Sequence, residues 1–174
     1  MTMETPVGPL VVLVGPPAAG KSVVGTMLAG QFGSAFFDTD TEVEAVAGKP
    51  VGDIFVDDGE PAFRDLERAA AERALSAAGA VVALGSGAVL DPGIQRLLAG
   101  QPVAYLEAGF TAITRRLGLD RPRVIIPGNP RGRLRSMLEE RRPVYERLAA
   151  FTVASDDLAP EEITDEIAAW LEEH

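Results

Sequence analysis

Several residue types that enzymes use for catalysis are absent or nearly absent from this 174-residue chain. It has no cysteine, so it can form neither a disulfide nor a thiolate metal site. Its one histidine is His174, the last residue, which argues against a histidine base or a Ser–His–Asp triad. The groups that remain are carboxylates, arginines, two lysines and a bound metal ion, which are the groups that phosphoryl transfer uses.

Long apolar runs and net positive charge are absent as well. No run of about 18 apolar residues could cross a bilayer, and residues 1–6 lack the basic and apolar parts of a signal peptide. The net charge of −10 argues against nucleic acid or an anionic membrane as a partner. We therefore expect a cytoplasmic, monomeric protein that binds small molecules and neither nucleic acid nor a membrane.

The strongest motif lies near the N-terminus. An apolar run over residues 10–14 leads into Gly-x-x-x-x-Gly-Lys-Ser at residues 15–22, and an apolar-periodic segment follows over residues 23–32. Strand, loop and helix in this order predict a phosphate-binding P-loop, although an accidental glycine-rich turn is the alternative. The expected contacts to a nucleotide are Gly15, Ala18, Ala19, Gly20, Lys21, Ser22 and Val23. Loop amides would face the phosphates, the lysine would pair with them, and the Ser22 hydroxyl would bind Mg²⁺.

Apolar strand patterns alternate with helical patterns along the rest of the chain. Strands are expected at residues 35–37, 80–84, 102–106 and 151–153, and helices at 39–46, 49–58, 60–78, 131–148 and 160–171, with another ending near residue 117. We expect Pro143 to interrupt the 131–148 helix. The alternation predicts a single α/β domain over residues 1–174, with three α/β/α layers around a mostly five-stranded parallel sheet. Residues 118–130 lack apolar periodicity and predict a mobile loop.

Carboxylates and glycines follow two of the expected strands. Asp38 and Asp40 come at the end of the 35–37 strand, where open α/β sheets place ligands. One could face the P-loop and the other a second substrate, or one could only cap the next helix. Gly85 and Gly87 end the 80–84 strand and predict either close approach to a ligand or only a tight turn.

Arginines are concentrated late in the chain. Ten of the 16 basic residues are arginines between Arg115 and Arg147. We expect one to three of them to bind phosphate or carboxylate, and the others to form ion pairs on a solvated helix. Earlier in the chain, Arg64 and Glu67 can share a helix face and form a surface ion pair, or Arg64, beside Phe63, can bind an anionic small molecule.

In this order and spacing, the motifs resemble shikimate kinase, a small P-loop enzyme of the nucleoside-monophosphate-kinase type. The matching pieces cover nearly the whole chain: Gly15–Ser22, Asp38–Asp40, Asp53–Phe55 with Asp58–Glu60, Phe63-Arg64-x-x-Glu67, Leu84–Ala88, Arg121-Pro122 and Arg141-x-Pro143-x-Tyr145. The P-loop alone would identify only a nucleotide-binding class, whereas the later motifs together are far more specific.

The resemblance implies a role for each matching residue. The implied catalytic residues are Asp40, Lys21 and Arg121, and Arg116 and Arg121 are implied nucleotide contacts, with Arg121 in a lid at about residues 117–130. Ser22 and Asp38 would hold Mg²⁺, the latter through water. Helical residues of about 39–78 would bind shikimate, whose implied contacts are Asp40, Phe55, Phe63, Arg64, Gly85, Ser86, Gly87 and Arg141. Arg64 and Arg141 would pair with its carboxylate.

The implied reaction is ATP-dependent phosphorylation of the 3-hydroxyl of shikimate, a step of chorismate and aromatic amino acid biosynthesis. One alternative is a kinase for another small hydroxylated acid such as gluconate, which would not need Arg64 and Arg141 to converge on one carboxylate. Another is a nucleotide-binding protein without kinase activity, although the presence of Lys21, Asp38 and Asp40 together argues against it.

Three segments depart from the family pattern. Ser86 replaces the middle residue of a glycine triplet, which is tolerable only if that position does not need a positive φ. The lid has Arg121-Pro122-Arg123-Val124 in place of Arg-Pro-Leu-Leu. Residues 155–160 contain no basic residue, so no side chain is assigned to stack on adenine.

The lid generates the first testable prediction. We expect Arg121→Ala to lower turnover by about 10³-fold, because a guanidinium that stabilises transition-state charge has an effect of that order. Steady-state measurement of ADP release checks this. Near-normal turnover would exclude Arg121 from this role, and Arg123 would be the next residue to replace.

Overall fold

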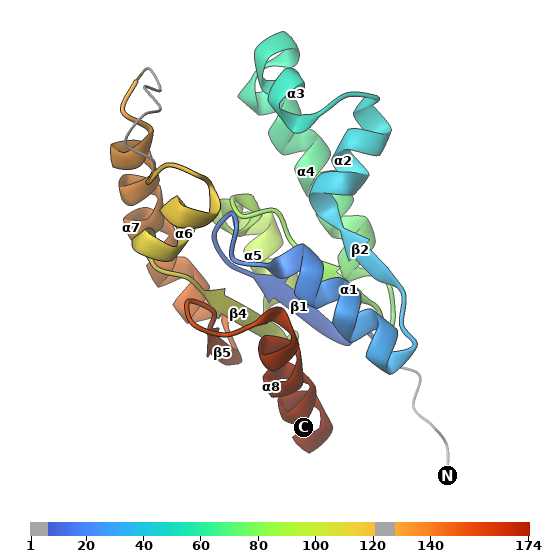
Figure 1. Cartoon of the computed structure of the whole chain (residues 1–174). Helices are drawn as coiled ribbons and strands as arrows, with labels where there is room; N and C mark the ends of the chain where they lie inside the picture. The colour runs from blue at the N-terminus through green and yellow to red at the C-terminus, as the bar shows by residue number, and fades with distance from the viewer. Residues whose placement is uncertain (1–6, 121–127) are drawn as a thin grey trace.

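The protein is built around a five-stranded, fully parallel sheet. The computed structural model describes residues 7–120 and 128–174. Within them the strand order is β2-β3-β1-β4-β5. The strands are β1 (Val11–Val14), β2 (Phe36–Asp38), β3 (Val81–Ala83), β4 (Val103–Glu107) and β5 (Phe151–Ala154). β1 lies between β3 and β4 at the centre (Figure 1). The predicted α/β fold with its five-stranded parallel sheet is therefore confirmed.

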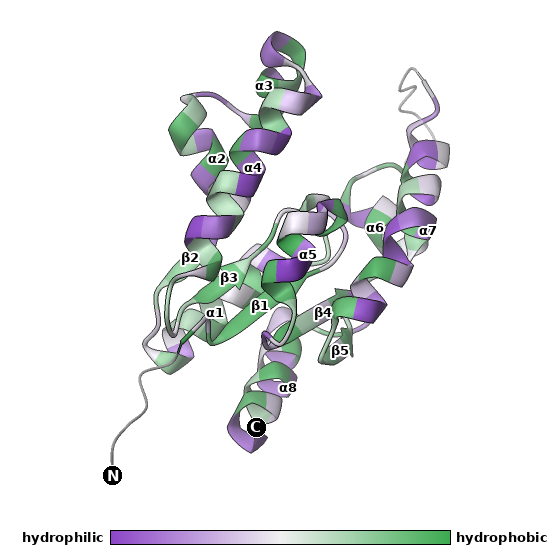
Figure 2. Ribbon diagram, turned by 180° about the vertical axis from the view of Figure 1, so that it is seen from behind, coloured by the Kyte–Doolittle hydropathy of each residue, from purple (hydrophilic) through white to green (hydrophobic). Residues whose placement is uncertain are grey.

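Alternate residues of β1 face opposite layers of helices. Val11 and Leu13 belong to a core formed with α1 (Lys21–Phe32) and α8 (Pro160–Glu173), whereas Val12 and Val14 belong to a second core on the other face. α4 (Glu60–Leu75) and α5 (Pro92–Leu98) cover that second face. Burial on both faces explains why β1 is continuously apolar, as Figure 2 shows for the sheet. The result is the three-layer arrangement that the alternating pattern predicts.

Three helices form a unit that extends beyond the edge of the sheet. α2 (Thr39–Ala47), α3 (Val51–Asp58) and the first half of α4 pack together (Figure 1). They share a small core of their own, made of Val43, Ile54, Phe63 and Ala70. This core holds the N-terminal half of α4 firmly, so that side chains on its inward face have fixed positions.

The remaining helices are η1 (Ala88–Leu90), α6 (Phe110–Arg116) and α7 (Pro130–Leu148). The expectation that Pro143 interrupts the last of these is wrong, because α7 continues through it. Tyr145 and Leu148 of the next turn pack into the core beside the sheet, and this packing compensates for the backbone hydrogen bond that proline lacks. Also, α4 ends at Leu75 rather than near residue 78, before a turn that contains Gly79 with φ 72°.

None of the helices in the described part of the chain combines the length and apolar character needed to cross a membrane.

Two glycines of α1 generate a stability prediction. A Cβ at Gly25 would overlap the ring of Phe36, whereas one at Gly30 would meet nothing within 4 Å. We expect Gly25→Ala to lower the free energy of unfolding by about 1–3 kcal/mol through overpacking. The matched control Gly30→Ala should raise it by about 0.5–1 kcal/mol, because alanine favours the helix. Urea denaturation measures both changes, and equal effects of the two variants would contradict the packing of α1 on β2.

Candidate active site

The loop between β1 and α1 has the backbone geometry of a phosphate cradle. Gly15 has φ 151° and Gly20 has φ 100°, as the motif predicts. A Cβ at Gly15 would lie 2.6 Å from the carbonyl oxygen of Leu106 on β4, so only glycine fits there. The Nζ of Lys21 donates to the carbonyl oxygens of Gly15 and Pro16, both at 2.8 Å. The lysine is thus held over the loop at the N-terminus of α1, where the backbone favours anions.

Asp38 connects this loop to the start of α2. Its Oδ2 accepts a hydrogen bond from the hydroxyl of Ser22. Its Oδ1 accepts hydrogen bonds from the backbone N–H groups of Asp40 at 3.1 Å and Thr41 at 3.4 Å. The two alternatives for this residue are therefore combined, since one oxygen caps α2 and the other faces the P-loop. A hydroxyl and a carboxylate side by side are oxygen ligands of the kind that Mg²⁺ uses together with phosphate and water.

Asp40 and Lys21 face each other across a cavity of about 320 Å³ that extends from the P-loop to Ser86. Burial, with a contribution from the negative charge of Asp38, raises the pKa of the Asp40 carboxyl. Burial also lowers the pKa of Lys21 to about 8, although Asp40 and Asp38 oppose this effect. Burial therefore shifts the pKa values of both groups toward neutral pH beside the phosphate loop.

Two arginines from different helices meet at the segment after β3. A Cβ at Gly87 would lie 2.8 Å from Nη1 of Arg64 on α4 and 3.2 Å from Nη2 of Arg141 on α7. One at Gly85 would lie 2.7 Å from Oδ1 of Asp40 and 3.1 Å from Oε2 of Glu67. Close approach, and not only a tight turn, thus accounts for both glycines.

The burial of Glu67 shows that Arg64 and Glu67 on α4 do not form a surface ion pair. Its side chain is 3% exposed, and its Oε1 lies 2.7 Å from Nη1 of Arg64. Burial raises the pKa of Glu67, and the hydrogen bond from Arg64 opposes this rise. Beside them, the rings of Phe55 and Phe63 pack with centroids 4.5 Å apart, and the Arg64 guanidinium lies 5.2 Å from the Phe63 centroid.

Ser86 fits without strain. Among the described residues the positive-φ positions other than glycine are Ala18 and Asn129, so Ser86 does not need the conformation that would have required glycine. Its hydroxyl accepts a hydrogen bond from Nη1 of Arg141 at 3.0 Å. The departure from a glycine triplet is therefore compatible with the site.

Arg116 connects the P-loop to the segment after β5. Its Nη1 donates to the carbonyl oxygen of Ala18 at 2.9 Å and its Nη2 to that of Ser155 at 2.6 Å. Arg116, which is predicted to contact the nucleotide, thus lies beside the P-loop. Arg121, the second arginine predicted to do so, lies outside the described residues, as does Arg123.

Comparisons with known proteins agree with this geometry. The family model for shikimate kinase matches residues 17–172 of the chain. The chain belongs to the shikimate kinase family. The shikimate kinase of Thermobifida fusca is 49% identical over 163 residues, which cover 94% of this chain and 95% of that protein. The shikimate kinase of Salinispora arenicola is 46% identical, with 94% and 98% coverage.

Solved shikimate kinases share the fold. The structure of the Acinetobacter baumannii shikimate kinase in complex with shikimate has a TM-score of 0.86 and 29% identity, covering 96% of this chain and 94% of that one. The shikimate kinase of Bacteroides thetaiotaomicron has a TM-score of 0.81 and 26% identity, with 93% and 97% coverage. A gluconokinase from Sinorhizobium meliloti has a TM-score of 0.59 and 20% identity, which shows a shared fold alone.

Three residues of this shikimate kinase family member contribute to the site although sequence reasoning assigned them no role in it. They are Thr39, whose hydroxyl accepts the Gly85 N–H at 2.8 Å, Glu67, and Tyr145, whose hydroxyl donates to the Ser86 carbonyl oxygen at 2.6 Å. Glu67 and Tyr145 stand in recognisable motifs, but their burial is a tertiary property. For Thr39 its place between two aspartates is the one feature of the sequence that points to the site.

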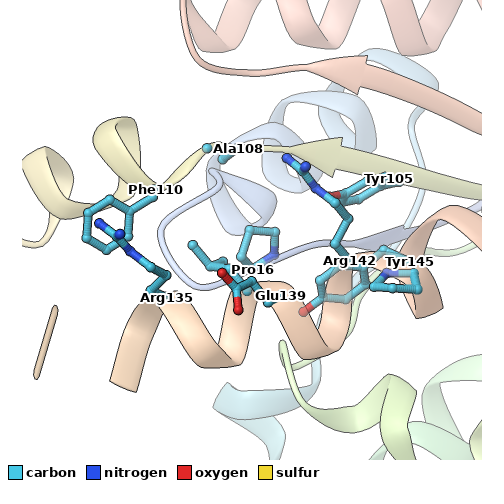
Figure 3. A pocket seen from close by; sticks show the side chains of 11 residues that line it. Pro16, Tyr105, Ala108, Phe110, Arg135, Glu139, Arg142 and Tyr145 are labelled. Atoms are coloured by element: carbon cyan, nitrogen blue, oxygen red, sulfur yellow. The ribbon is translucent and has the colours of Figure 1, made fainter. Parts of the chain in front are cut away.

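A second cavity, of about 450 Å³, lies beside the P-loop between β4, α6 and α7. Figure 3 shows Pro16 on one wall, with Arg135, Glu139 and Arg142 of α7 facing it. The Arg135 guanidinium lies 4.4 Å from the ring centroid of Phe110. None of the predicted site residues lines this cavity, whereas Tyr145, whose hydroxyl donates to the Ser86 carbonyl oxygen, does.

The buried carboxylate generates a pH prediction. Because the pKa of Glu67 is raised in the folded state, the folded chain binds more protons than the unfolded chain between the ordinary pKa and the raised one. Proton binding by Glu67 therefore stabilises the folded wild type at low pH, and the free energy of unfolding falls as pH rises through that interval. We expect the stability of Glu67→Gln relative to wild type to increase with pH, as measured by urea denaturation from pH 4 to pH 8.

Glu72→Gln is the matched control, because Glu72 is exposed on the same helix. Its stability relative to wild type should change less over this range. If the relative stability of Glu67→Gln stays flat or falls with pH, the ion pair with Arg64 outweighs the cost of burying the carboxylate.

Proposed function

We propose that the chain transfers the γ-phosphoryl group of ATP to the 3-hydroxyl of shikimate, giving shikimate 3-phosphate and ADP, with Mg²⁺ as the metal. The observation that carries the proposal is the meeting of Arg64 and Arg141 at Gly87, next to Asp40 and the P-loop. Two guanidiniums suit a carboxylate, and the P-loop suits phosphates. A hydroxylated acid held between them would present a hydroxyl to the γ-phosphate.

On the nucleotide side, the loop amides and Lys21 would bind the phosphates, and Arg116 would line the nucleotide site. Ser22 and Asp38 would hold Mg²⁺, which neutralises charge on the phosphates during transfer. In our proposal Arg121 completes this set from a lid at about residues 117–130. Closure of such a lid would exclude water and so suppress ATP hydrolysis.

On the acceptor side, Asp40 is the residue proposed to orient and deprotonate the attacking hydroxyl. Its raised pKa brings its basicity closer to neutral pH, which favours proton transfer. Arg64 and Arg141 would hold the carboxylate, and Phe55 and Phe63 would pack against the ring of the substrate. Gly85, Ser86 and Gly87 would contribute backbone contacts. The helical unit of α2, α3 and α4 would thus bind the acceptor substrate.

The convergence of the two arginines also separates this proposal from its nearest alternative. A gluconate kinase would use the same P-loop but would not need Arg64 and Arg141 beside one another. We further propose that the chain acts as a single-domain monomer in the cytoplasm.

The proposal is tested by measuring ADP release from ATP and Mg²⁺ with shikimate, with gluconate and with neither. We expect release only with shikimate, and identification of shikimate 3-phosphate as the product would establish the position of transfer. Release with gluconate alone would favour the alternative. Tight ATP binding without turnover on either acid would favour a nucleotide-binding protein without kinase activity.

Asp40→Asn tests the acceptor side separately. We expect ATP to bind with normal affinity, because Asp40 lies beside the P-loop and not in it, while turnover falls by at least about 10²-fold, as for loss of a general base. Calorimetric ATP titration and ADP release measure the two properties. Loss of both would show that Asp40 is structural.

A further inference from the structure

Ser86 contacts α7 at two points. Its hydroxyl accepts a hydrogen bond from Nη1 of Arg141 at 3.0 Å, and its carbonyl oxygen accepts one from the hydroxyl of Tyr145 at 2.6 Å. Arg141 and Tyr145 are one turn apart and so share a face of the helix. One residue of the loop after β3 therefore holds two side chains of a helix that is distant in sequence.

The two arginines of the site are held by different chemistry. Arg64 lies beside two carboxylates, with Nε 3.5 Å from Glu60 and Nη1 2.7 Å from the buried Glu67. Within residues 7–120 and 128–174 no carboxylate pairs with Arg141, and its buried Nε has no hydrogen-bond partner. Its hydrogen-bond partners are neutral: Nη1 donates to the Ser86 hydroxyl, and the Tyr145 hydroxyl lies beside the guanidinium. Arg141 is thus available to pair with an anionic ligand.

The position of α7 against the sheet does not depend on the Ser86 hydroxyl. The Tyr145 ring stacks on the Tyr105 ring of β4, with centroids 5.1 Å apart and an interplanar angle of 27°. Both rings lie on one wall of the second cavity (Figure 3). Removal of the Ser86 hydroxyl would therefore release the Arg141 side chain and leave this ring packing in place.

We propose that Ser86 is a positioning residue that fixes the Arg141 guanidinium for the carboxylate of the acceptor substrate, an inference that rests on the proposed function. Arginine has many rotamers, and ordering them on binding weakens affinity. A hydroxyl that holds Nη1 orders the side chain beforehand. The carboxylate takes no part in the reaction and makes the same contact before and during transfer, so Ser86 affects substrate binding more than the chemical step.

The test compares Ser86→Ala and Ser86→Gly with wild type by steady-state kinetics. We expect the KM for shikimate to rise by about 10-fold, the lower end of the range for loss of a hydrogen bond to a charged group, while kcat changes by less than about 3-fold. The KM for ATP should change less than that for shikimate. Ser86→Thr keeps the hydroxyl and should restore much of the affinity, and Ser76→Ala, at the far end of α4, is the matched control.

A double-mutant cycle shows whether Ser86 acts through Arg141. In an Arg141→Ala background, replacement of Ser86 by alanine should change shikimate affinity by less than about 2-fold, because the side chain that it positions is gone. Calorimetric titration with shikimate provides this readout even where turnover is slow. Tyr145→Phe removes the second contact and keeps the hydroxyl contact of Ser86, so it should change affinity less than Ser86→Ala.

Two results would overturn the inference. One is an unchanged KM for shikimate in both Ser86→Ala and Ser86→Gly, and the other is an equal loss of affinity with and without Arg141. Thermal unfolding of each variant shows whether a loss of shikimate affinity comes from misfolding. If Ser86→Ala and Ser86→Gly are misfolded, the comparison of Ser86→Thr with wild type decides whether the hydroxyl positions Arg141. A wild-type protein that releases no ADP with shikimate would refute the proposed function and this inference together, whereas an active wild type with unaffected variants would refute only the inference.

Discussion

The site depends on a close approach of opposite charges at the end of β3, which is possible because two residues there have no side chain. Asp40 and Glu67 lie where a Cβ of Gly85 would point, while Arg64 and Arg141 lie where a Cβ of Gly87 would point. A methyl group at either position would overlap a charged atom. The missing side chains thus let two carboxylates and two guanidiniums gather at this segment, with Arg64 and Glu67 paired directly.

This arrangement also determines the protonation behaviour of the site. Burial raises the pKa values of Asp40 and Glu67 and lowers that of Lys21. Glu67 is partly compensated by Arg64, whereas Arg141 has a neutral hydroxyl beside it. Arg141 is therefore the one of these two guanidiniums that has no carboxylate within ion-pair distance among the described residues, and it lies where the carboxylate of the substrate is expected.

Much of this could be predicted from the sequence because it is locally encoded. The P-loop follows from residue types at fixed spacing between a strand and a helix, and Gly15 and Gly20 adopt the positive φ that the motif requires. The continuous apolar strands predict a sheet buried on both faces, and the sheet has that form.

Other features were decided only by tertiary structure. Pro143 should break a helix by its local chemistry, yet packing of the following turn keeps α7 continuous. The i,i+3 spacing of Arg64 and Glu67 was compatible with a solvated surface, and only the packing of α4 against α2 and the sheet buries the carboxylate. In the sequence Ser86 stands out only because it replaces a glycine of the family's triplet. Its role as a hydrogen-bond acceptor depends on Arg141 of α7, 55 residues away. The sequence by itself therefore determined the fold and the phosphate-binding loop, since short-range spacing encodes them. Which charges are buried, paired or left free was settled by contacts between distant segments, because burial and pairing are properties of the assembled chain.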